Sequence, residues 1–243
     1  MEKLTTRISN VIVKAGKLPG YKMHPYETYR RLNKDSGVDK LQHPREIYYI
    51  DQKKLDKAAD KAITKHKQRF AATGAAVGAP GGPVAMFGGA VIDVEEYVRR
   101  MFLLTQELGH IYGVLPNPFT YEETGSYDDY FDSIQHDLLK MMLLGLGGSG
   151  VSIDTLDKKD DADKKEPAKV DEEVMYKVAV KIADIVGKKK MKKHAAKMMG
   201  RSVPLVGGGI NGTLNYYFLN QLGKNTKKHL KKEHEEVRAY LNR

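Results

Sequence analysis

A glutamate and a histidine three residues apart have a spacing that suits metal binding or acid–base catalysis. Glu107 and His110 form the pattern Glu-x-x-His inside a long apolar stretch. Residues three apart share one face of a helix, so the two side chains could act as paired metal ligands or as an acid–base pair. A di-iron site needs a second copy of this motif, and the other histidines provide none. With Asp93, these two residues define one hypothesis, a helical enzyme that is either a hydrolase or metal-dependent.

The segment that holds this pair also predicts a simpler role for its charged residues. Apolar residues recur in steps of three and four from Phe87 to Tyr112, which predicts a helix with one buried stripe, capped by Gly113. Four charged residues fall opposite the stripe: Asp93, Glu96, Arg100 and Glu107. That side is interpreted as a solvated or ion-paired face, with Glu96 and Arg100 spaced as an i,i+4 ion pair.

A glycine motif in the middle of the chain does not predict nucleotide binding. The sequence "GLGGSG" at 145–150 matches G-x-G-x-x-G, but a dinucleotide site requires a strand before the motif and a helix after it. A helical pattern precedes the motif and a charged segment follows it, so the glycines are interpreted as the end of a helix. The glycines near Gly81 and Gly207 lack the Lys-Ser/Thr of a phosphate loop. We expect no cofactor and identify no small-molecule substrate.

Basic clusters point to an anionic partner. The net charge is +10, and "GKKKMKKHAAKMMGR" at 187–201 holds seven cations and no carboxylate. A basic amphipathic helix suits an anionic membrane surface. The same charge would suit nucleic acid, but no recognition-helix or RNA-module signature is present, so no nucleic acid is expected. The candidate lipid-binding residues are Lys188, Lys189, Lys190, Lys192, Lys193, Lys197, Lys227 and Lys228.

A glycine-rich stretch without charge runs over residues 70–92. It leaves two interpretations open: an elbow between packed helices, or a hairpin that enters or lies on a membrane. Its low hydropathy and two prolines favour the elbow in the resting protein. A second glycine-rich segment begins at Pro204, and small residues in both would let the helices approach closely. The candidate contacts with a membrane or partner are Gly74, Gly78, Pro80, Gly81, Gly82, Phe87, Gly207, Gly208 and Gly212.

The whole chain predicts a helical protein. Its 243 residues have mostly helical periodicity and include no cysteine, which fits a reducing cytoplasm. The N-terminus has no signal-peptide pattern and predicts an amphipathic helix. We expect one all-α domain in which two glycine-rich helical segments pack together. Residues 1–44 are expected to form an N-terminal helical extension, and 45–243 the main domain, with a flexible charged loop at about 152–170.

Two segments resemble the signatures of the EcsC family. These are "AATGAAVGAPGGPVAMFGGAVIDVEEYVRRMFLLTQELGHIYG" and "SVPLVGGGINGTLNYYFLNQLGKNTKKHL", within a resemblance that covers about residues 45–235. The matching positions are Gly74, Gly78, Pro80, Gly81, Asp93, Tyr112, Gly113, Pro204, Gly207, Gly208, Gly212 and Leu214.

The EcsC resemblance implies a fold more than an activity. The family is mainly bacterial, largely helical, without a settled biochemical activity, and named after a member of an operon that encodes an ABC transporter. Together with the basic clusters, it predicts a cytoplasmic protein held peripherally on the inner face of the cell membrane. Its expected partner is anionic lipid or a membrane protein, such as a transporter. The enzyme that uses Asp93, Glu107 and His110 remains the alternative.

Overall fold

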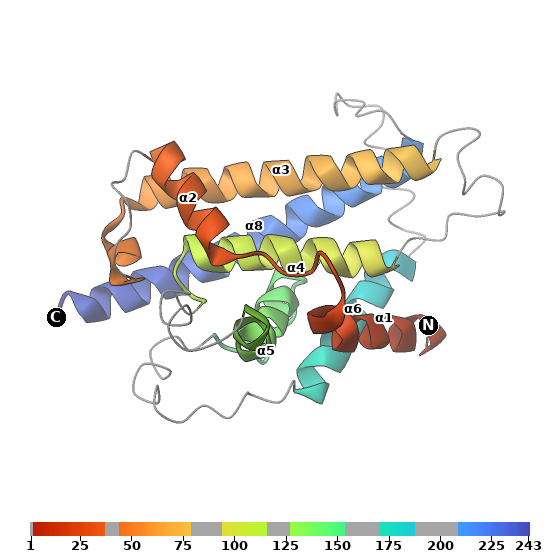
Figure 1. Cartoon of the computed structure of the whole chain (residues 1–243). Coiled ribbons are helices and arrows are strands. Elements are labelled where there is room, and N and C mark those ends of the chain that lie inside the picture. Colours follow the sequence, from red (N-terminus) through yellow and green to blue (C-terminus); the bar gives the residue numbers. More distant parts are fainter. Residues whose placement is uncertain (1, 37–43, 79–93, 116–126, 154–170, 188–208) are drawn as a thin grey trace.

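The described part of the chain is entirely helical. The computed structural model describes residues 2–36, 44–78, 94–115, 127–153, 171–187 and 209–243 (Figure 1). Within these ranges the chain forms seven α-helices and two short 3-10 helices, without a strand. The all-α prediction is therefore confirmed for this part. Most of both glycine-rich segments lies outside it, so the packing of these segments against each other stays a prediction.

The N-terminal helices contribute to the main hydrophobic core. They are α1 (Glu2–Lys14), η1 (Ala15–Lys17) and α2 (Pro25–Ser36), followed by η2 (Pro44–Tyr49). Ile8 and Ile12 of α1 and Leu32 of α2 are buried in the same apolar cluster as the later helices. The amphipathic N-terminal helix is confirmed, and the boundary at residue 44 stays a prediction.

The two longest helices run antiparallel, side by side. They are α3 (Gln52–Gly78) and α8 (Gly209–Leu241) (Figure 1). Asn215 donates a hydrogen bond to the backbone carbonyl of Phe70 near one end, and Lys231 reaches Asp56 near the other. The apolar residues that recur along one side of α3 are buried throughout: Leu55, Ala59, Ala62, Ile63 and Phe70.

Helix α4 (Val94–Ile111) lies at the centre, where fourteen of its eighteen residues are buried. The described members of its predicted stripe are all buried: Val94, Val98, Met101, Thr105, Leu108 and Tyr112. Gly113 follows the helix with a φ of 67°. The Val114 and Gly113 amides bond to the carbonyls of Gly109 and His110, which is the Schellman pattern that favours glycine at this position. The predicted glycine cap is confirmed.

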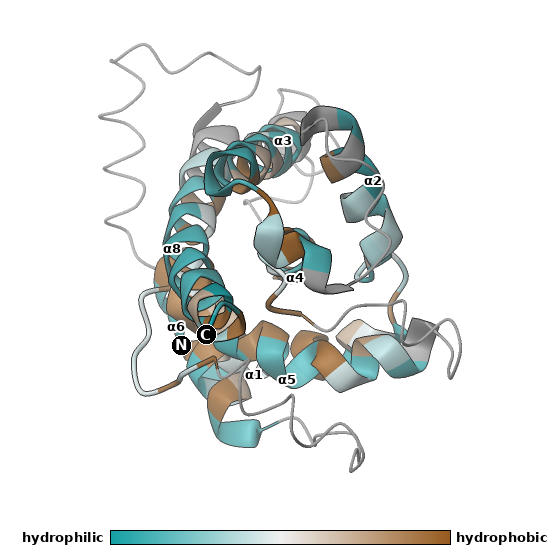
Figure 2. Ribbon diagram, turned by 90° about the vertical axis from the view of Figure 1, so that its left-hand side faces the viewer, coloured by the Kyte–Doolittle hydropathy of each residue, from teal (hydrophilic) through white to brown (hydrophobic). Residues whose placement is uncertain are grey.

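Two shorter helices complete the core: α5 (Tyr127–Gly145) and α6 (Glu172–Gly187). Gly147 has a φ of 73°, and Gly147 and Gly148 donate to the carbonyls of Leu144 and Leu143. The "GLGGSG" sequence therefore ends a helix, as its context predicted. Figure 2 shows hydrophobic residues concentrated on α5 and α6, whereas the visible side of α3 is mostly hydrophilic. None of the described helices combines the length and the apolarity needed to cross a bilayer.

Glycines allow close helix contact, but at positions that the sequence analysis did not select. A Cβ on Gly223 of α8 would lie 2.7 Å from Ile63 of α3, and one on Gly145 of α5 would overlap Thr226 and Leu222 of α8. Small residues therefore bring α8 against both α3 and α5.

The substitution Gly145→Ala tests this contact. Because the added methyl group overlaps the Thr226 hydroxyl, we expect the free energy of unfolding in urea to fall by about 1–3 kcal/mol. Adding Thr226→Ala removes the overlapping atom and should restore part of the loss. A single variant as stable as the parent would contradict the tight packing.

Candidate functional site

A buried carboxylate joins three helices. Glu107 of α4 is 4% exposed. Its Oε1 accepts a hydrogen bond from Arg31 of α2 at 2.5 Å, and its Oε2 lies 2.7 Å from Nε2 of His66 on α3. Lys65 of α3 approaches both oxygens, at 3.3 and 3.5 Å. Three polar side chains thus surround one carboxylate where α2, α3 and α4 meet.

The surrounding charges keep Glu107 ionised. Burial alone would raise the pKa of its carboxyl group, but the hydrogen bond from His66 and the charges of Lys65 and Arg31 lower it to about 2. Burial also lowers the pKa of His66 and outweighs the opposing effect of Glu107. At neutral pH His66 is therefore neutral and donates its Nε2–H to the carboxylate.

The sequence predicted an ion-paired or solvated face here, and only the ion pairs are found. Glu107 and Glu96 are both buried, Glu107 where α2 packs against α4 and Arg31 reaches it. Glu96 forms the predicted ion pair with Arg100, at 2.6 Å, and a second pair with Arg99. The solvated interpretation is therefore wrong for these two residues.

None of the three partners of Glu107 was predicted from the sequence. His66 falls within the apolar stripe of α3, between Ile63 and Phe70. A polar residue at such a position signals a buried partner, and this signal was available. Arg31 lies 76 residues before Glu107, on a helix that carries no pattern linking it to α4. Only the tertiary fold brings it to the carboxylate.

His110 is turned toward a different neighbour. It is fully buried, its Nε2 lies 2.8 Å from the Tyr130 hydroxyl, and its ring packs near Tyr29. Burial lowers its pKa to about 3, against a smaller raising effect of Glu107. Glu-x-x-His therefore divides into two sites, an ionised carboxylate held by cations and a neutral histidine in the core.

This division matters for the enzyme hypothesis. A base is most effective when its pKa lies near the working pH, so a carboxyl group with a pKa of about 2 and a histidine with a pKa of about 3 are weak bases at neutral pH. Among the described side chains, no group of three or more His, Asp or Glu residues is placed to hold a metal ion. Asp93 lies outside the described residues.

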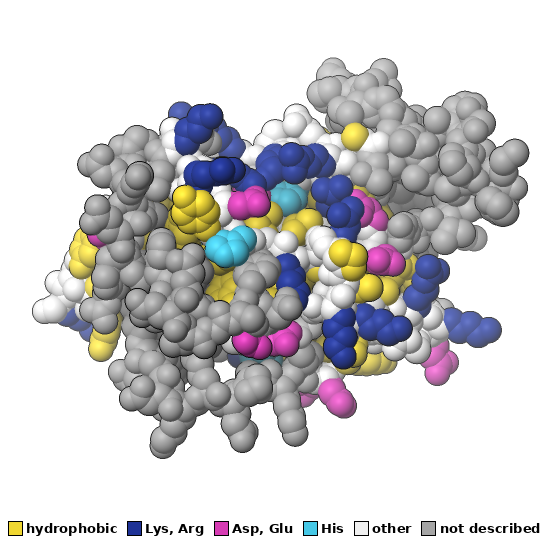
Figure 3. All heavy atoms as spheres, viewed as in Figure 1, with side chains coloured by type: hydrophobic (Ala, Val, Ile, Leu, Met, Phe, Trp, Pro, Cys, Tyr) yellow, Lys and Arg dark blue, Asp and Glu magenta, His cyan; other side chains and the backbone are white. Residues whose placement is uncertain are grey.

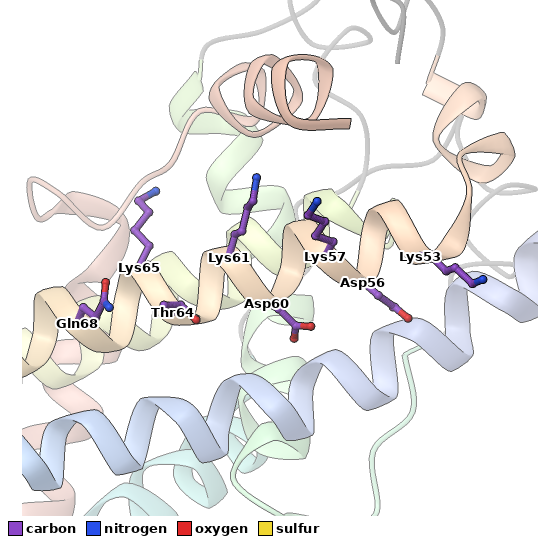
Figure 4. Close-up of a pocket in the computed structure, with 8 residues that line it drawn as sticks. All are labelled: Lys53, Asp56, Lys57, Asp60, Lys61, Thr64, Lys65 and Gln68. Atoms are coloured by element: carbon purple, nitrogen blue, oxygen red, sulfur yellow. The ribbon is translucent and has the colours of Figure 1, made fainter. Parts of the chain in front are cut away.

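A row of lysines runs along the exposed side of α3. The lysine row consists of Lys53, Lys57, Lys61 and Lys65, spaced four residues apart. Together with Asp56, Asp60, Thr64 and Gln68, these residues line a shallow hollow of about 610 Å³ whose wall comes from α3 alone (Figure 4). A hollow formed by one helix cannot enclose a small molecule, but it leaves the ammonium groups accessible to a large partner.

The acidic residues of the same helix are turned away from the lysine row. Figure 4 shows Lys57, Lys61 and Lys65 on one side of α3, with Asp56 and Asp60 directed toward α8. There Asp60 pairs with Lys227 at 2.7 Å. Asp56 pairs with Lys231 at 2.8 Å.

Helix α8 also fixes the charge of Asp56. Burial raises the pKa of this carboxyl group, but hydrogen bonds from Lys231, Tyr112 and Gln52 lower it overall. Lysines of α8 thus neutralise the acidic side of α3, and the opposite side keeps its positive charge.

A smaller pocket opens beside the lysine row, between α2, α3 and α4. Its volume is about 200 Å³. Arg31, Lys61, Lys65 and Glu107 line it together with the Thr28 side chain. The remaining wall is apolar and consists of Leu32, Ala58, Ala62 and Ile111.

The other predicted contact residues are only partly within the described chain. Gly74 and Gly78 belong to the C-terminal part of α3, and Gly212 to the first turn of α8. Lys227 is engaged with Asp60, whereas Lys228 is exposed. The rest lie outside the described residues: Pro80, Gly81, Gly82, Phe87, Lys188, Lys189, Lys190, Lys192, Lys193, Lys197, Gly207 and Gly208.

Comparison of the chain with protein-family models, with curated proteins and with solved structures finds no match. The EcsC resemblance therefore stays a prediction, and the functional argument relies on the residues themselves.

The substitution Glu107→Gln tests the buried ion pairs. Removing the charge leaves Arg31 and Lys65 without their carboxylate, so the free energy of unfolding at pH 7 should fall by about 3 kcal/mol. The matched control is Glu236→Gln, which removes an exposed pair with Lys232 and should cost under about 0.5 kcal/mol. Equal effects of the two variants would contradict the assigned role.

The lowered pKa of Glu107 predicts that the free energy of unfolding depends on pH, and the same variant tests this. The folded pKa of Glu107 lies below its ordinary value of 4.5, so its stabilisation is complete above that value and is lost as the pH falls toward 2. A shift of this size corresponds to about 3 kcal/mol. Urea unfolding between pH 5 and 2 should therefore show a steeper loss for the parent chain than for Glu107→Gln.

His110 predicts a second acid-sensitive range. The folded chain keeps it neutral, whereas the unfolded chain protonates it below its ordinary pKa of 6.5. Stability should therefore fall as the pH drops from 6.5 toward 3, by up to about 1.4 kcal/mol per pH unit. His110→Gln should reduce the slope between pH 6 and 4, while His66 and His234, whose pKa values are also lowered, keep part of it. Superimposable slopes would show that His110 is not responsible.

Proposed function

We propose that this protein binds anionic membrane surfaces peripherally, through the cationic side of α3 and α2. The carrying observation is that Lys57, Lys61 and Lys65 lie on the outward side of α3, with the exposed Lys53 before them in the row, while Asp56 and Asp60 are turned toward α8 (Figure 4). Cations near an anionic lipid surface contribute about 1 kcal/mol each. Asp56 and Asp60 line the same hollow, but they are paired with Lys231 and Lys227 of α8, so they offset the charge of the lysine row less than unpaired carboxylates would.

Helix α2 extends the positive surface. Tyr26, Arg30 and Lys34 recur every four residues on its exposed side, and Tyr26 is 54% exposed. Tyrosine is enriched at membrane interfaces, where the ring meets the headgroups. Figure 3 shows Lys and Arg side chains gathered along the upper edge of the molecule, over α2 and α3.

Peripheral binding to an anionic membrane surface is the same hypothesis that arose from the sequence. The described part of the binding surface is now placed on α3 and α2. The lysines at 188–197 and the glycine-rich segments remain candidate contacts, and the EcsC resemblance agrees with membrane association and a link to a transporter. Lys227, however, is occupied by α3. The inner leaflet of a bacterial membrane is the expected location, because cytoplasmic polybasic surfaces bind anionic lipid there.

The enzyme alternative gains no support from the described geometry. Glu107 is held by three partners and His110 is directed elsewhere. Both side chains stabilise the fold around the cationic surface, and we do not propose a reaction for them.

Vesicle flotation with the double variant Lys53→Gln, Lys57→Gln tests the proposal. Both lysines are exposed, so the fold should be kept. Loss of two cations should weaken binding to vesicles that contain phosphatidylglycerol by roughly thirtyfold, corresponding to about 2 kcal/mol. Raising the ionic strength to about 1 M should abolish binding of the parent chain, because the Debye length falls to about 3 Å.

The control is the double variant Lys3→Gln, Lys14→Gln, which removes the same charge from the exposed side of α1. Helix α1 lies on the opposite side of α4 from α3 (Figure 1). The control variant should bind the vesicles as tightly as the parent chain does. Failure of the parent chain to float with anionic vesicles at low salt would overturn the proposal, and equal losses in both double variants would show that net charge, rather than this surface, is responsible.

A further inference from the structure

A fully buried histidine joins η2, α4 and α8. His234 of α8 is 0% exposed. Its Nδ1 lies 2.9 Å from the backbone carbonyl oxygen of Tyr112, so Nδ1 carries a hydrogen and donates it. Its ring stacks on Tyr48 of η2, with the ring centroids 5.1 Å apart. The Tyr48 hydroxyl donates a hydrogen bond to the Gly113 carbonyl at 2.7 Å. This contact between His234 and Tyr48 holds η2 against the C-terminal end of α4.

The contact suits only a neutral imidazole. With Nδ1 as the donor, Nε2 of neutral His234 carries no proton, and it is buried without a hydrogen-bond partner among the described residues. Protonation would place an N–H group and a positive charge there, away from water, which is costly. The face of the Tyr48 ring attracts a cation, but this attraction is weaker than the hydration that a buried charge loses.

The groups around His234 do not reverse this preference. Burial is the largest influence on its pKa and lowers it, and the charge of Arg238 lowers it further. The groups that raise this pKa are the Tyr112 carbonyl, Glu235 and Asp56. The hydroxyls of Tyr48 and Tyr112 stay neutral, because burial raises the pKa of each. The folded pKa of His234 therefore lies below its ordinary value of 6.5, and the contact loses stability as the pH falls from 6.5.

Helix η2 carries apolar groups beside the lysine row. Its last three residues are Ile47, Tyr48 and Tyr49, of which the first two are buried and Tyr49 is 62% exposed. Lys53, the first lysine of the row, follows shortly after them in the sequence. Tyrosine is enriched at membrane interfaces, and neighbouring cations hold a segment near anionic headgroups. A released η2 would therefore add an aromatic contact to the proposed binding surface.

We propose that protonation of His234 releases η2, so that its tyrosines enter the interface of an anionic membrane beside the lysine row. The entry into the membrane rests on the proposed function. A surface potential of about −30 mV raises the local proton concentration about threefold, so the membrane itself favours the released state. The charged imidazole that is released also adds a cation to the surface.

Hydrogen–deuterium exchange at pH 7.5 and 5.5 tests the release. After correction for the intrinsic exchange rate, the open fraction of η2 in the parent chain should rise about tenfold, because an open imidazole titrates near 6.5. His234→Gln keeps a donor for the Tyr112 carbonyl and cannot be protonated, so it should remove the rise. The matched control His229→Gln removes an exposed histidine from the same helix and should keep the rise.

A second variant changes η2 instead of the histidine. Tyr48→Phe removes the hydrogen bond to Gly113, so it should open η2 further at both pH values and leave the ratio between them unchanged. Exchange in the middle of α4 at pH 7.5 should match the parent chain in each variant, which shows that the core is folded. A parent chain without the rise, or a rise that persists in His234→Gln, would overturn the proposal.

A fluorescent reporter tests entry into the membrane. The chain has no tryptophan, so Tyr49→Trp places a single indole on η2. With vesicles that contain phosphatidylglycerol, whose phosphodiester stays ionised in this range, its emission should shift to shorter wavelength at pH 5.5 more than at pH 7.5. Adding His234→Gln should remove this difference, and an equal shift in that double variant would overturn the proposal.

Vesicle flotation of the parent chain at both pH values separates the release of η2 from the membrane proposal. Release of η2 in the exchange experiment without flotation at either pH would support the switch at His234 and overturn the membrane proposal, and with it the entry of the tyrosines. Flotation without any release of η2 would overturn the switch and leave the membrane proposal intact.

Discussion

The arrangement of the described helices depends on one carboxylate that is removed from water. Glu107 sits near the end of the central helix, where burial without partners would cost several kcal/mol. Arg31 comes from α2, and His66 and Lys65 come from α3. Because each partner must stand at a fixed distance, this single group sets the position of α2 across α3 and α4. Helix α2 in turn forms one wall of the smaller pocket beside the lysine row.

A second set of ion pairs determines which charged side chains of α3 face solvent and which face α8. The sequence of α3 mixes lysines and aspartates. Lys227 and Lys231 of α8 attract Asp60 and Asp56 to the interhelical side. Lys57, Lys61 and Lys65 lie on the other side of α3 (Figure 4). The packing of α8 therefore pairs two carboxylates that an isolated α3 would leave without these partners.

Both constraints use charge to specify position rather than to maximise stability. Exposed pairs such as Asp60 with Lys227 contribute little free energy, whereas breaking the buried group at Glu107 is costly. Hydrophobic packing of α3, α4, α5 and α8 supplies the main stabilisation. The charges select one arrangement of helices among those that the apolar stripes would allow, and that arrangement carries the proposed binding surface.

The sequence by itself determined the helices, their buried stripes and their ends. Periodicity is a local property, so the stripes of α3 and α4 and the glycine caps at Gly113 and Gly147 follow from neighbouring residues. Contacts between residues that are distant in the sequence could not be predicted from this local periodicity. Tertiary structure alone decided that Arg31 meets Glu107, that His110 turns to Tyr130, and that α8 neutralises the aspartates of α3. The physical reason is that an ion pair depends on distance in space, and no local pattern records which remote helix will supply the opposite charge.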